Sequence, residues 1–284
     1  MLHVGFGGRL ATSLKKVIIP IARFDHHSWQ KRGMLLKQLP NRNVISIKGE
    51  GALTFLDGLV TNHLDEGKLA KGELIHAALL TPQGKYRADF LISMTQDGML
   101  LLDHDAGLGD DLLRALKMYK LRLPLELKPQ EDIVAWHPNQ GMMDPRDPAL
   151  GARSYGPEHS GDATAQYEEL RIKAGIPDSP DFMIAQPFWL ETGALQRHGV
   201  SMNKGCFIGQ EVTARMHHRD AIRRIFTKIS SDKAIPEAGT NITDEQGRPA
   251  GIITSRWGNQ GLAYIRKDRS NNLQADGCNL EIMP

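Results

Sequence analysis

Apolar and polar residues alternate in the first part of this sequence with periods that predict both strands and helices. Residues 43–47 (NVISI) alternate as a half-buried strand does, and GEG then stops the run. Apolar residues at helical spacing predict one helix over residues 52–64 and another over residues 108–120. Between them lie three β-rich runs, separated by the turn sequences TPQGK and TQDG. These runs predict an antiparallel meander over residues 73–80, 86–94 and 99–105.

The middle of the chain has a less regular pattern. Strand-like runs at residues 121–127 and 132–138 lead into residues 138–163, where prolines, glycines and charged residues dominate. We expect at most a short strand in this connection. Residues 164–175 (TAQYEELRIKAG) then predict a helix that ends at Gly175, because a proline follows two positions later.

Short strands and turns from Arg223 onward predict a small β-barrel or sandwich. We therefore expect two folded parts, an α+β body over about residues 38–221 and an all-β C-terminal domain over residues 222–284. Residues 1–37 would precede both as a basic extension.

The composition is typical of a globular protein outside the membrane. The chain has 284 residues, 40% of them hydrophobic and 24% charged. No apolar run approaches the roughly 18 to 20 residues that cross a bilayer, so we expect no membrane association. Two cysteines, Cys206 and Cys278, cannot build a disulfide framework and form no C-x-x-C pair. We therefore expect a reducing compartment and no all-cysteine metal cluster held by this chain alone. We also expect no metal site and a monomer.

The net charge of +2 conceals an uneven distribution. Residues 1–33 carry six basic residues against one acidic residue, which leaves the other 251 residues at about −3. The body therefore gives no electrostatic reason to expect nucleic-acid binding. The basic segment fits two interpretations: a transit peptide, which would place the protein in the mitochondrial matrix, or a mis-assigned start before Met34 in a cytoplasmic bacterial protein.

The stretch SMNKGCFIGQEVTAR, residues 201–215, places one of the two cysteines between glycines and ahead of a predicted helix. Backbone N–H groups at a helix N-terminus stabilise a thiolate, and Lys204 could add to that effect. Cys206 would then be available for nucleophilic attack, redox exchange or metal ligation. The alternative is a small buried hydrophobic residue, which is how an isolated cysteine usually behaves. The flanking Gly205 and Gly209 favour the first interpretation, because glycine allows positive φ or close approach of a ligand.

The segment KGCFIGQEVTAR, together with LVTN (59–62), AGIP (174–177) and IRR (222–224), resembles the YgfZ family of folate-binding proteins, relatives of the glycine-cleavage T-protein. Within that family, TARMHHRDAIRR is most similar to the mitochondrial iron–sulfur assembly factor and its bacterial relatives. The resemblance runs from about residue 38 to the C-terminus. It implies an α+β, T-protein-like (GcvT-like) fold, with antiparallel sheets and helices around a central cavity and a small C-terminal β-barrel.

The resemblance also implies a function and a set of site residues. Members of this type support assembly or repair of [4Fe–4S] proteins with tetrahydrofolate or another reduced folate, so the expected partners are iron–sulfur assembly proteins or client enzymes. The motif positions carried over are Lys204, Gly205, Cys206, Gly209, Gln210, Glu211, Arg215 and Asn62. Gln210 and Glu211 fit either folate contacts or ordinary helix residues, and Arg215 also fits a surface ion pair.

Two positions depart from the T-protein pattern that the resemblance supplies. In GKYRADFLI the first member of the expected carboxylate pair is Ala88, and only Asp89 remains. In RIKAGIP, Lys173 stands where a folate-binding glutamate is expected. Asp89 fits either a cavity-facing folate contact or a hydrogen-bonded support, and Arg87 is a cation available for the folate glutamate tail. Loss of one carboxylate removes charge that aminomethyl transfer would use.

Three other groups of residues have ordinary structural interpretations. His217 and His218 are adjacent, so they point about 100° apart on a helix and cannot chelate one ion together. The DPRDP segment at residues 144–148 has the composition of a loop. Trp136, Trp189 and Trp257 fit core positions as well as cavity walls.

Three functions remain open at the level of sequence. The first is a folate-binding accessory protein in iron–sulfur assembly that uses Cys206 as a thiol contact. The second is a folate-dependent one-carbon (aminomethyl) transferase, which would depend on Asp89. The third is an interaction module without a folate ligand.

Overall fold

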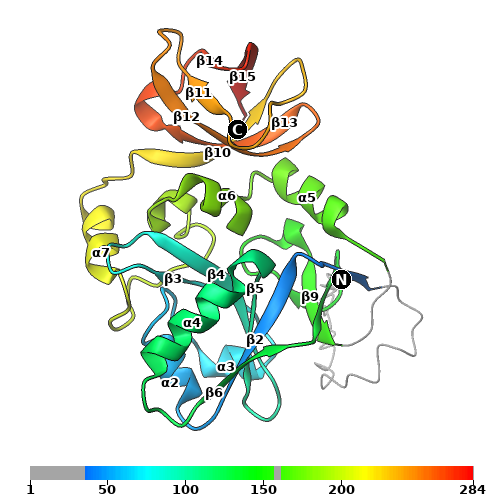
Figure 1. Ribbon diagram of the computed structural model, residues 1–284, viewed down its shortest axis with the longest axis vertical. Helices are drawn as coiled ribbons and strands as arrows, with labels where there is room; N and C mark the ends of the chain where they lie inside the picture. Colours follow the sequence, from blue (N-terminus) through cyan, green and yellow to red (C-terminus); the bar gives the residue numbers. More distant parts are fainter. Residues whose placement is uncertain (1–35, 157–160, 284) are drawn as a thin grey trace, which may run out of the picture. The chain divides into compact units, whose positions relative to one another are not determined.

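The first layer of the fold is a five-stranded antiparallel sheet in the order β3-β4-β5-β2-β6 (Figure 1). The computed structural model describes residues 36–156 and 161–283, so the basic segment 1–33 lies outside the described residues. The strands are β2 (Arg42–Lys48), β3 (Ile75–Leu80), β4 (Tyr86–Met94), β5 (Leu100–Asp105) and β6 (Glu126–Gln130). Since β3, β4 and β5 are consecutive neighbours, the predicted meander is confirmed.

Helices cover one face of this sheet. They are α2 (Ala52–Asp57), α3 (Glu66–Ala70) and α4 (Gly109–Lys120), with a 3₁₀ turn at Ala106–Leu108 before α4. Phe55 and Leu56 of α2 and Leu116 of α4 pack against the inward side chains of the strands. This packing explains why the apolar stripes predicted both helices.

Helix α2 is shorter than the predicted helix over residues 52–64. It ends at Asp57, and Gly58 follows as its C-cap. Leu59 and Val60 still contact the core, but from a turn. The helical spacing of the apolar residues was therefore a true signal of burial and a wrong signal of helix length.

A second layer covers the opposite face of the sheet. Its four strands, in the order β1-β7-β9-β8, are β1 (Lys37–Gln38), β7 (Ile133–His137), β8 (Met142–Met143) and β9 (Ala152–Gly156). Helices α5 (Thr164–Lys173) and α6 (Ser179–Ala185) follow, with 3₁₀ turns at Pro148–Leu150 and Trp189–Thr192. Trp136 and Trp189 are both buried in the core, while Trp257 is partly exposed.

Two sequence expectations need correction here. β2 was predicted to be half buried, but Ile45 packs on the helix face while Val44 packs in the second layer, so both faces of the strand are covered. The connection over residues 138–163 was expected to hold at most a short strand, yet it supplies β8 and β9. Its charged residues misled the prediction because several of them are buried.

The C-terminal part is a closed six-stranded barrel, as the sequence predicted (Figure 1). Its strands are β10 (Arg224–Ser230), β11 (Asn241–Thr243), β12 (Pro249–Trp257), β13 (Gln260–Arg266), β14 (Leu273–Ala275) and β15 (Cys278–Ile282), with a 3₁₀ turn at Lys267–Arg269. Helix α7 (Gln210–His218) precedes it. None of the helices in the described ranges has the length and apolarity that crossing a bilayer requires.

The barrel is joined to the body by buried polar and aromatic contacts. Arg171 of α5 donates to Ser255 of β12 at 2.8 Å, and the Ser255 hydroxyl donates to Asp181 of α6 at 2.6 Å. Phe226 of β10 packs edge-on against Phe182 of α6, with ring centroids 5.4 Å apart. Arg171 and Asp181 also form an ion pair at 2.6 Å, so Ser255 joins the barrel to a buried ion pair of the body.

Candidate functional site

The two motif segments singled out in the sequence meet at Lys204. Its ammonium group donates to the backbone carbonyls of Asp57, Val60 and Asn62 at 2.5, 2.7 and 3.0 Å. Only 1% of the Lys204 side chain is exposed, and the Asp57 carboxylate lies 3.7 Å away. Burial lowers the pKa of Lys204, and the Asp57 carboxylate opposes the shift. A lysine has three N–H donors, so these carbonyls satisfy all of them.

This geometry corrects the sequence interpretation of Lys204. Lys204 was one group that could help to ionise Cys206, and the structure shows that its donors bond to the turn that follows α2. Lys204 therefore fastens the KGC segment to the LVTN segment. The same contacts explain why α2 ends early, because the carbonyls at its end bond to lysine instead of to a further helical turn.

Cys206 lies on an exposed turn between Lys204 and helix α7. The neighbouring Phe207 is buried, 8% exposed, and packs with Trp189 and Leu190 in the core. The alternation of buried lysine, exposed thiol and buried phenylalanine holds the sulfur at the surface. The alternative of a cysteine sealed in the core is thus not what the structure shows.

Gly209 lies where α7 meets the turn between β3 and β4. It is the N-cap of α7 with φ +79°, and a Cβ there would lie 2.7 Å from the Thr81 carbonyl and 2.9 Å from Gly84 Cα. Glycine is required on both grounds. Gly205, by contrast, is exposed, and a Cβ on it would have no atom within 4 Å. The two motif glycines therefore have different roles.

The polar residues of α7 lie on its outer side. Glu211 and Arg215 form an exposed ion pair one helical turn apart, and the Gln210 amide donates to the Gly205 carbonyl at 3.4 Å. The surface-pair interpretation of Arg215 is what the structure shows. His217 and His218 end this helix on the exposed surface.

Asn62 of the LVTN segment bridges two parts of the chain. Its amide nitrogen donates to the carbonyls of His76 and His198 at 2.9 and 2.7 Å, and its oxygen accepts from the His63 N–H at 2.9 Å. Thr61, which the sequence analysis did not single out, is fully buried and donates to the Gly199 carbonyl at 2.7 Å. Both side chains hold the turn against strand β3 and the segment before Lys204.

Asp89 is buried, 1% exposed, in a polar cluster on the second-layer face of β4. Its carboxylate accepts from Tyr86 at 2.8 Å and from Ser179 at 2.7 Å, and His76 Nε2 lies 3.2 Å from its other oxygen. Burial alone would raise the pKa of Asp89, but the hydrogen bond and charge of His76 outweigh it, so the pKa is lowered. Of the two interpretations left open, these contacts favour the hydrogen-bonded support.

A β-bulge produces this cluster. The pairing of β3 with β4 shifts by one residue, so that Leu79 faces Ala88 while Leu80 faces Tyr86. The extra residue, Arg87, turns Tyr86 onto the face of Asp89, which strict alternation would not allow. Hydrophobic periodicity does not reveal such a bulge. The contact of Tyr86 with Asp89 could therefore not be predicted from the sequence.

His76 connects the buried cluster to the thiol turn. Its ring contacts Asp89, its carbonyl accepts from Asn62, and the Asn62 carbonyl accepts from Lys204, two residues before Cys206. We call this chain of contacts, from Asp89 through His76, Asn62 and Lys204 to Cys206, the interior-to-thiol chain. Every link is a contact of 3.2 Å or less, apart from the covalent backbone at its end.

The remaining predicted folate contacts lie elsewhere. Arg87 makes a bidentate ion pair with Asp111 of α4, at 2.8 and 3.1 Å, which raises the pKa of Arg87. Lys173 is exposed and pairs with Glu169 on the same helix. The five residues assigned to folate thus form three separate groups: Asn62 with Asp89 around His76, Arg87 with Asp111, and Gln210 with Glu211 on α7.

A buried charge network joins the two sheets and was missed from the sequence. Arg146 donates to Asp144 at 2.8 Å and to Asp178 at 3.0 Å, and Arg42 donates to Asp103 at 2.6 Å. The other members of the network are Arg153, Tyr155 and Tyr167. The DPRDP segment, interpreted as a loop, supplies part of this network. A local run of charges and prolines gives no sign that its partners lie on other strands.

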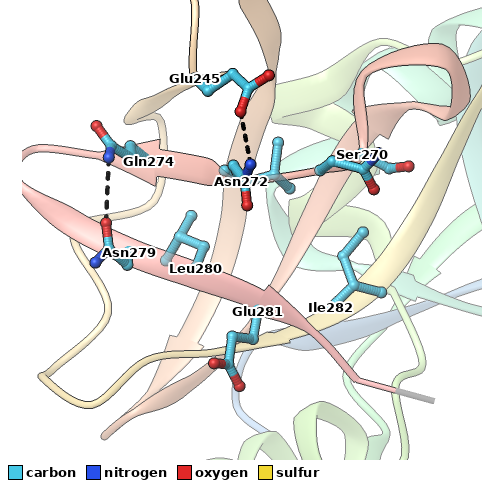
Figure 2. A pocket seen from close by; sticks show the side chains of 10 residues that line it. Glu245, Ser270, Asn272, Gln274, Asn279, Leu280, Glu281 and Ile282 are labelled. Atoms are coloured by element: carbon cyan, nitrogen blue, oxygen red, sulfur yellow. Dashed lines mark hydrogen bonds between the residues drawn. The ribbon is translucent and has the colours of Figure 1, made fainter.

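Figure 2 shows the residues that line a pocket on the barrel. It is lined from β14, β15 and the neighbouring loops, with Asn272 donating to Glu245 at 2.6 Å and Gln274 to Asn279 at 3.2 Å. None of the predicted site residues lines it. Among the described residues, no group of three His, Cys, Asp or Glu side chains is placed to hold a metal ion.

Comparison with known proteins gives three kinds of match. Residues 223–284 match the family model of the CAF17 C-terminal β-barrel domain. The solved structure of glycine cleavage system aminomethyltransferase T from Bartonella henselae superposes with a TM-score of 0.66 over 88% of this chain and 84% of that one, at 14% identity. This likeness shows that the fold is T-protein-like, as predicted.

The sequence relatives are iron–sulfur cluster assembly factors. The mitochondrial iron–sulfur cluster assembly factor IBA57 homolog of Mycosarcoma maydis is 31% identical over 69% of this chain and 57% of its own length. The homolog of Neurospora crassa is 30% identical over 66% of this chain, and the mouse IBA57 is 27% identical over 81%. The chain thus spans little more than half the length of the two fungal relatives, and 77% of the mouse protein.

Proposed function

We propose that this protein is an accessory factor in the assembly or repair of [4Fe–4S] proteins, and that Cys206 is its chemical contact. The observation that carries the proposal is the exposed thiol on a turn fixed by Lys204 and Phe207. The names of the fungal and mouse relatives support the same process.

The number of thiols limits what the chain can do with a cluster. Iron–sulfur clusters are held mainly by cysteine thiolates, usually four. This chain has two cysteines, and Cys278 is on barrel strand β15, remote in sequence from the thiol turn. A cluster that Cys206 touches therefore needs most of its ligands from another protein. Cys206 fits a transient contact during transfer, with the cluster as cargo.

A matched pair of variants tests the role of the thiol. In cells that lack this protein, Cys206→Ser is expected to abolish support of a [4Fe–4S] enzyme, while Cys278→Ser retains it. Circular dichroism and the unfolding midpoint serve as folding controls, and neither variant should change them much because both thiols lack a strong partner. Full enzyme activity with Cys206→Ser would remove the thiol from the mechanism.

We also propose tetrahydrofolate, or another reduced folate, as a ligand, on the basis of the motif resemblance. Asn62 and Asp89 have their polar atoms in use inside the protein, and the other assigned residues lie in separate groups. The residues present therefore do not outline one preformed folate site. A thermal-shift titration tests this part: ligand at about 100 Kd should add roughly 2.7 kcal/mol of stability. No shift would leave the thiol proposal standing without folate.

The same contacts do not favour aminomethyl transfer. Asp89 would have to act on the substrate, yet it is buried and accepts hydrogen bonds from Tyr86 and Ser179.

The names of the relatives also suggest a location for this protein. They are named as mitochondrial, so we propose that the basic segment 1–33 is a mitochondrial targeting sequence. Mass spectrometry of the native N-terminus tests this, since an intact Met1 in the mature protein would contradict it.

A further inference from the structure

A leucine at the end of α4 is held in a backbone conformation that leucine does not favour. The Leu123 N–H donates to the Lys120 carbonyl at 3.0 Å, which closes a β-turn with Leu121 in its second position. Leu121 has φ 50° and ψ −115°. These angles belong to a type II′ turn, where the second position is ordinarily glycine. For a leucine they cost free energy.

Most of the Leu121 side chain is exposed to solvent. It is 82% exposed, the highest value among the large hydrophobic residues of the described chain that lie at the surface. Met118, one helical turn before it, is 57% exposed, and Leu123 is 46% exposed. We call these three residues the α4 patch; it lies where α4 leads into β6 (Figure 1). Glycine is the ordinary residue at this turn position, and the exposed leucine side chain gains little packing within the described chain.

Basic residues lie next to the α4 patch residues in the sequence. Lys117, Lys120 and Arg122 lie within the same seven residues, 117–123, which contain no acidic residue. None of these three cations has an ion pair within the described chain, although the neighbouring Arg114 and Lys128 do. The segment is therefore locally basic in a body that is acidic overall. Exposed apolar side chains interspersed with cations along the chain complement a surface that carries apolar side chains and carboxylates.

We propose that the α4 patch is a docking surface for a protein that presents apolar side chains ringed by Asp and Glu. This goes beyond the thiol chemistry, because the patch is on a different element from Cys206. The chain's own segment 1–33 is a poor occupant, since it is strongly basic itself. A second copy of the chain and an anionic membrane are the competing occupants.

The test uses an 18-residue amphipathic peptide with leucines on one face and glutamates beside them. Fluorescence anisotropy measures its binding to the full chain, against the same peptide with lysine in place of glutamate. We expect binding of the acidic peptide only, with affinity that falls as salt rises. Leu121→Gly should weaken it about tenfold or more, as should Lys120→Glu combined with Arg122→Glu. Met143→Asp, at a similarly exposed apolar residue on β8, is the control and should bind like the parent.

The thermal midpoint of Leu121→Gly separates docking from packing. If the leucine is kept for a partner, the glycine variant unfolds at the same or a higher temperature while its peptide affinity falls. A midpoint several degrees lower would show that Leu121 serves the fold of this chain, and the proposal would be wrong. It would also be overturned by equal binding of the lysine peptide, by tighter binding to vesicles of phosphatidylcholine with phosphatidylserine, or by self-association lost in Leu121→Gly.

Discussion

At the scale of single residues, Lys204 has a structural role in the thiol site, because it positions the turn that carries Cys206. A buried ammonium group that donates to three carbonyls replaces the hydrogen bonds that a longer α2 would have made. The cysteine two residues later is exposed, while Lys204 before it and Phe207 after it are anchored. The exposed thiol and the anchoring side chains thus belong to different residues of one short motif.

Replacement of this lysine should cost stability. Lys204→Met leaves three carbonyls without their donor, so we expect the free energy of unfolding to fall by about 2–3 kcal/mol. Urea denaturation at neutral pH measures it. Lys173→Met is the control, because Lys173 is exposed and has one surface ion pair, worth less than about 1 kcal/mol. Equal losses for the two variants would contradict the anchoring role.

At the scale of elements, the start of α7 and the β3–β4 turn fit together through two glycines. Gly209 lies against Thr81 and Gly84, and a Cβ on Gly84 would in turn lie 2.9 Å from Val212 of α7. The helix can approach the hairpin only because both positions lack side chains. Two contacts therefore hold the thiol turn: Gly209 packs against the β3–β4 hairpin, and Lys204 donates to the LVTN segment.

The two motif glycines give a matched experiment for this contact. Gly209→Ala should destabilise the protein by about 2 kcal/mol, because alanine at positive φ is strained and its methyl group would collide with the hairpin. Gly205→Ala should change stability by less than about 0.5 kcal/mol, since space around it is open. Thermal or urea unfolding of both variants provides the measurement. A larger effect at Gly205 than at Gly209 would contradict this packing of α7 on the hairpin.

The sequence anticipated elements better than contacts. The meander, α4, α5 and the barrel follow from periodicity and turn residues, and Gly209 followed from its type and place. The sequence pattern could not predict the hydrogen-bond partners of Lys204, because these acceptors lie about 140 residues earlier in the chain. The position of Tyr86 beside Asp89 depends on a β-bulge, which the sequence pattern does not reveal. The burial of the DPRDP residues depends on partners from distant parts of the chain.

At the scale of the whole molecule, buried carboxylates link the two sheets and make folding depend on pH. Burial alone would raise the pKa values of Asp144 and Asp178, but neighbouring arginines outweigh it and lower both. Asp89 is lowered as well, through His76. Burial raises the pKa values of Asp105 and Glu168, which therefore oppose the trend. We expect Asp144 and Asp178 to set the sign of the pH dependence, because their arginine partners lower both pKa values in the folded state.

The sign of the pH dependence follows from these directions. Asp144 and Asp178 stay ionised in the folded protein at a pH where the unfolded chain binds protons, so acid favours unfolding. We expect full stability from these groups above about pH 5 and a progressive loss below about pH 4. Urea midpoints between pH 6 and pH 3 measure the slope. Asp178→Asn should be less stable at pH 6 and lose less on acidification than the parent, and an unchanged slope would contradict the assignment.

The interior-to-thiol chain places the surface sulfur at the end of a continuous path of contacts from the core. Asn62 joins the two halves of this path, because it donates to the His76 carbonyl and its own carbonyl accepts from Lys204. We expect an event near Asp89 that shifts these contacts to change the free energy of the thiol turn. By reciprocity, capture of a molecule at Cys206 would then change the free energy of that event by the same amount.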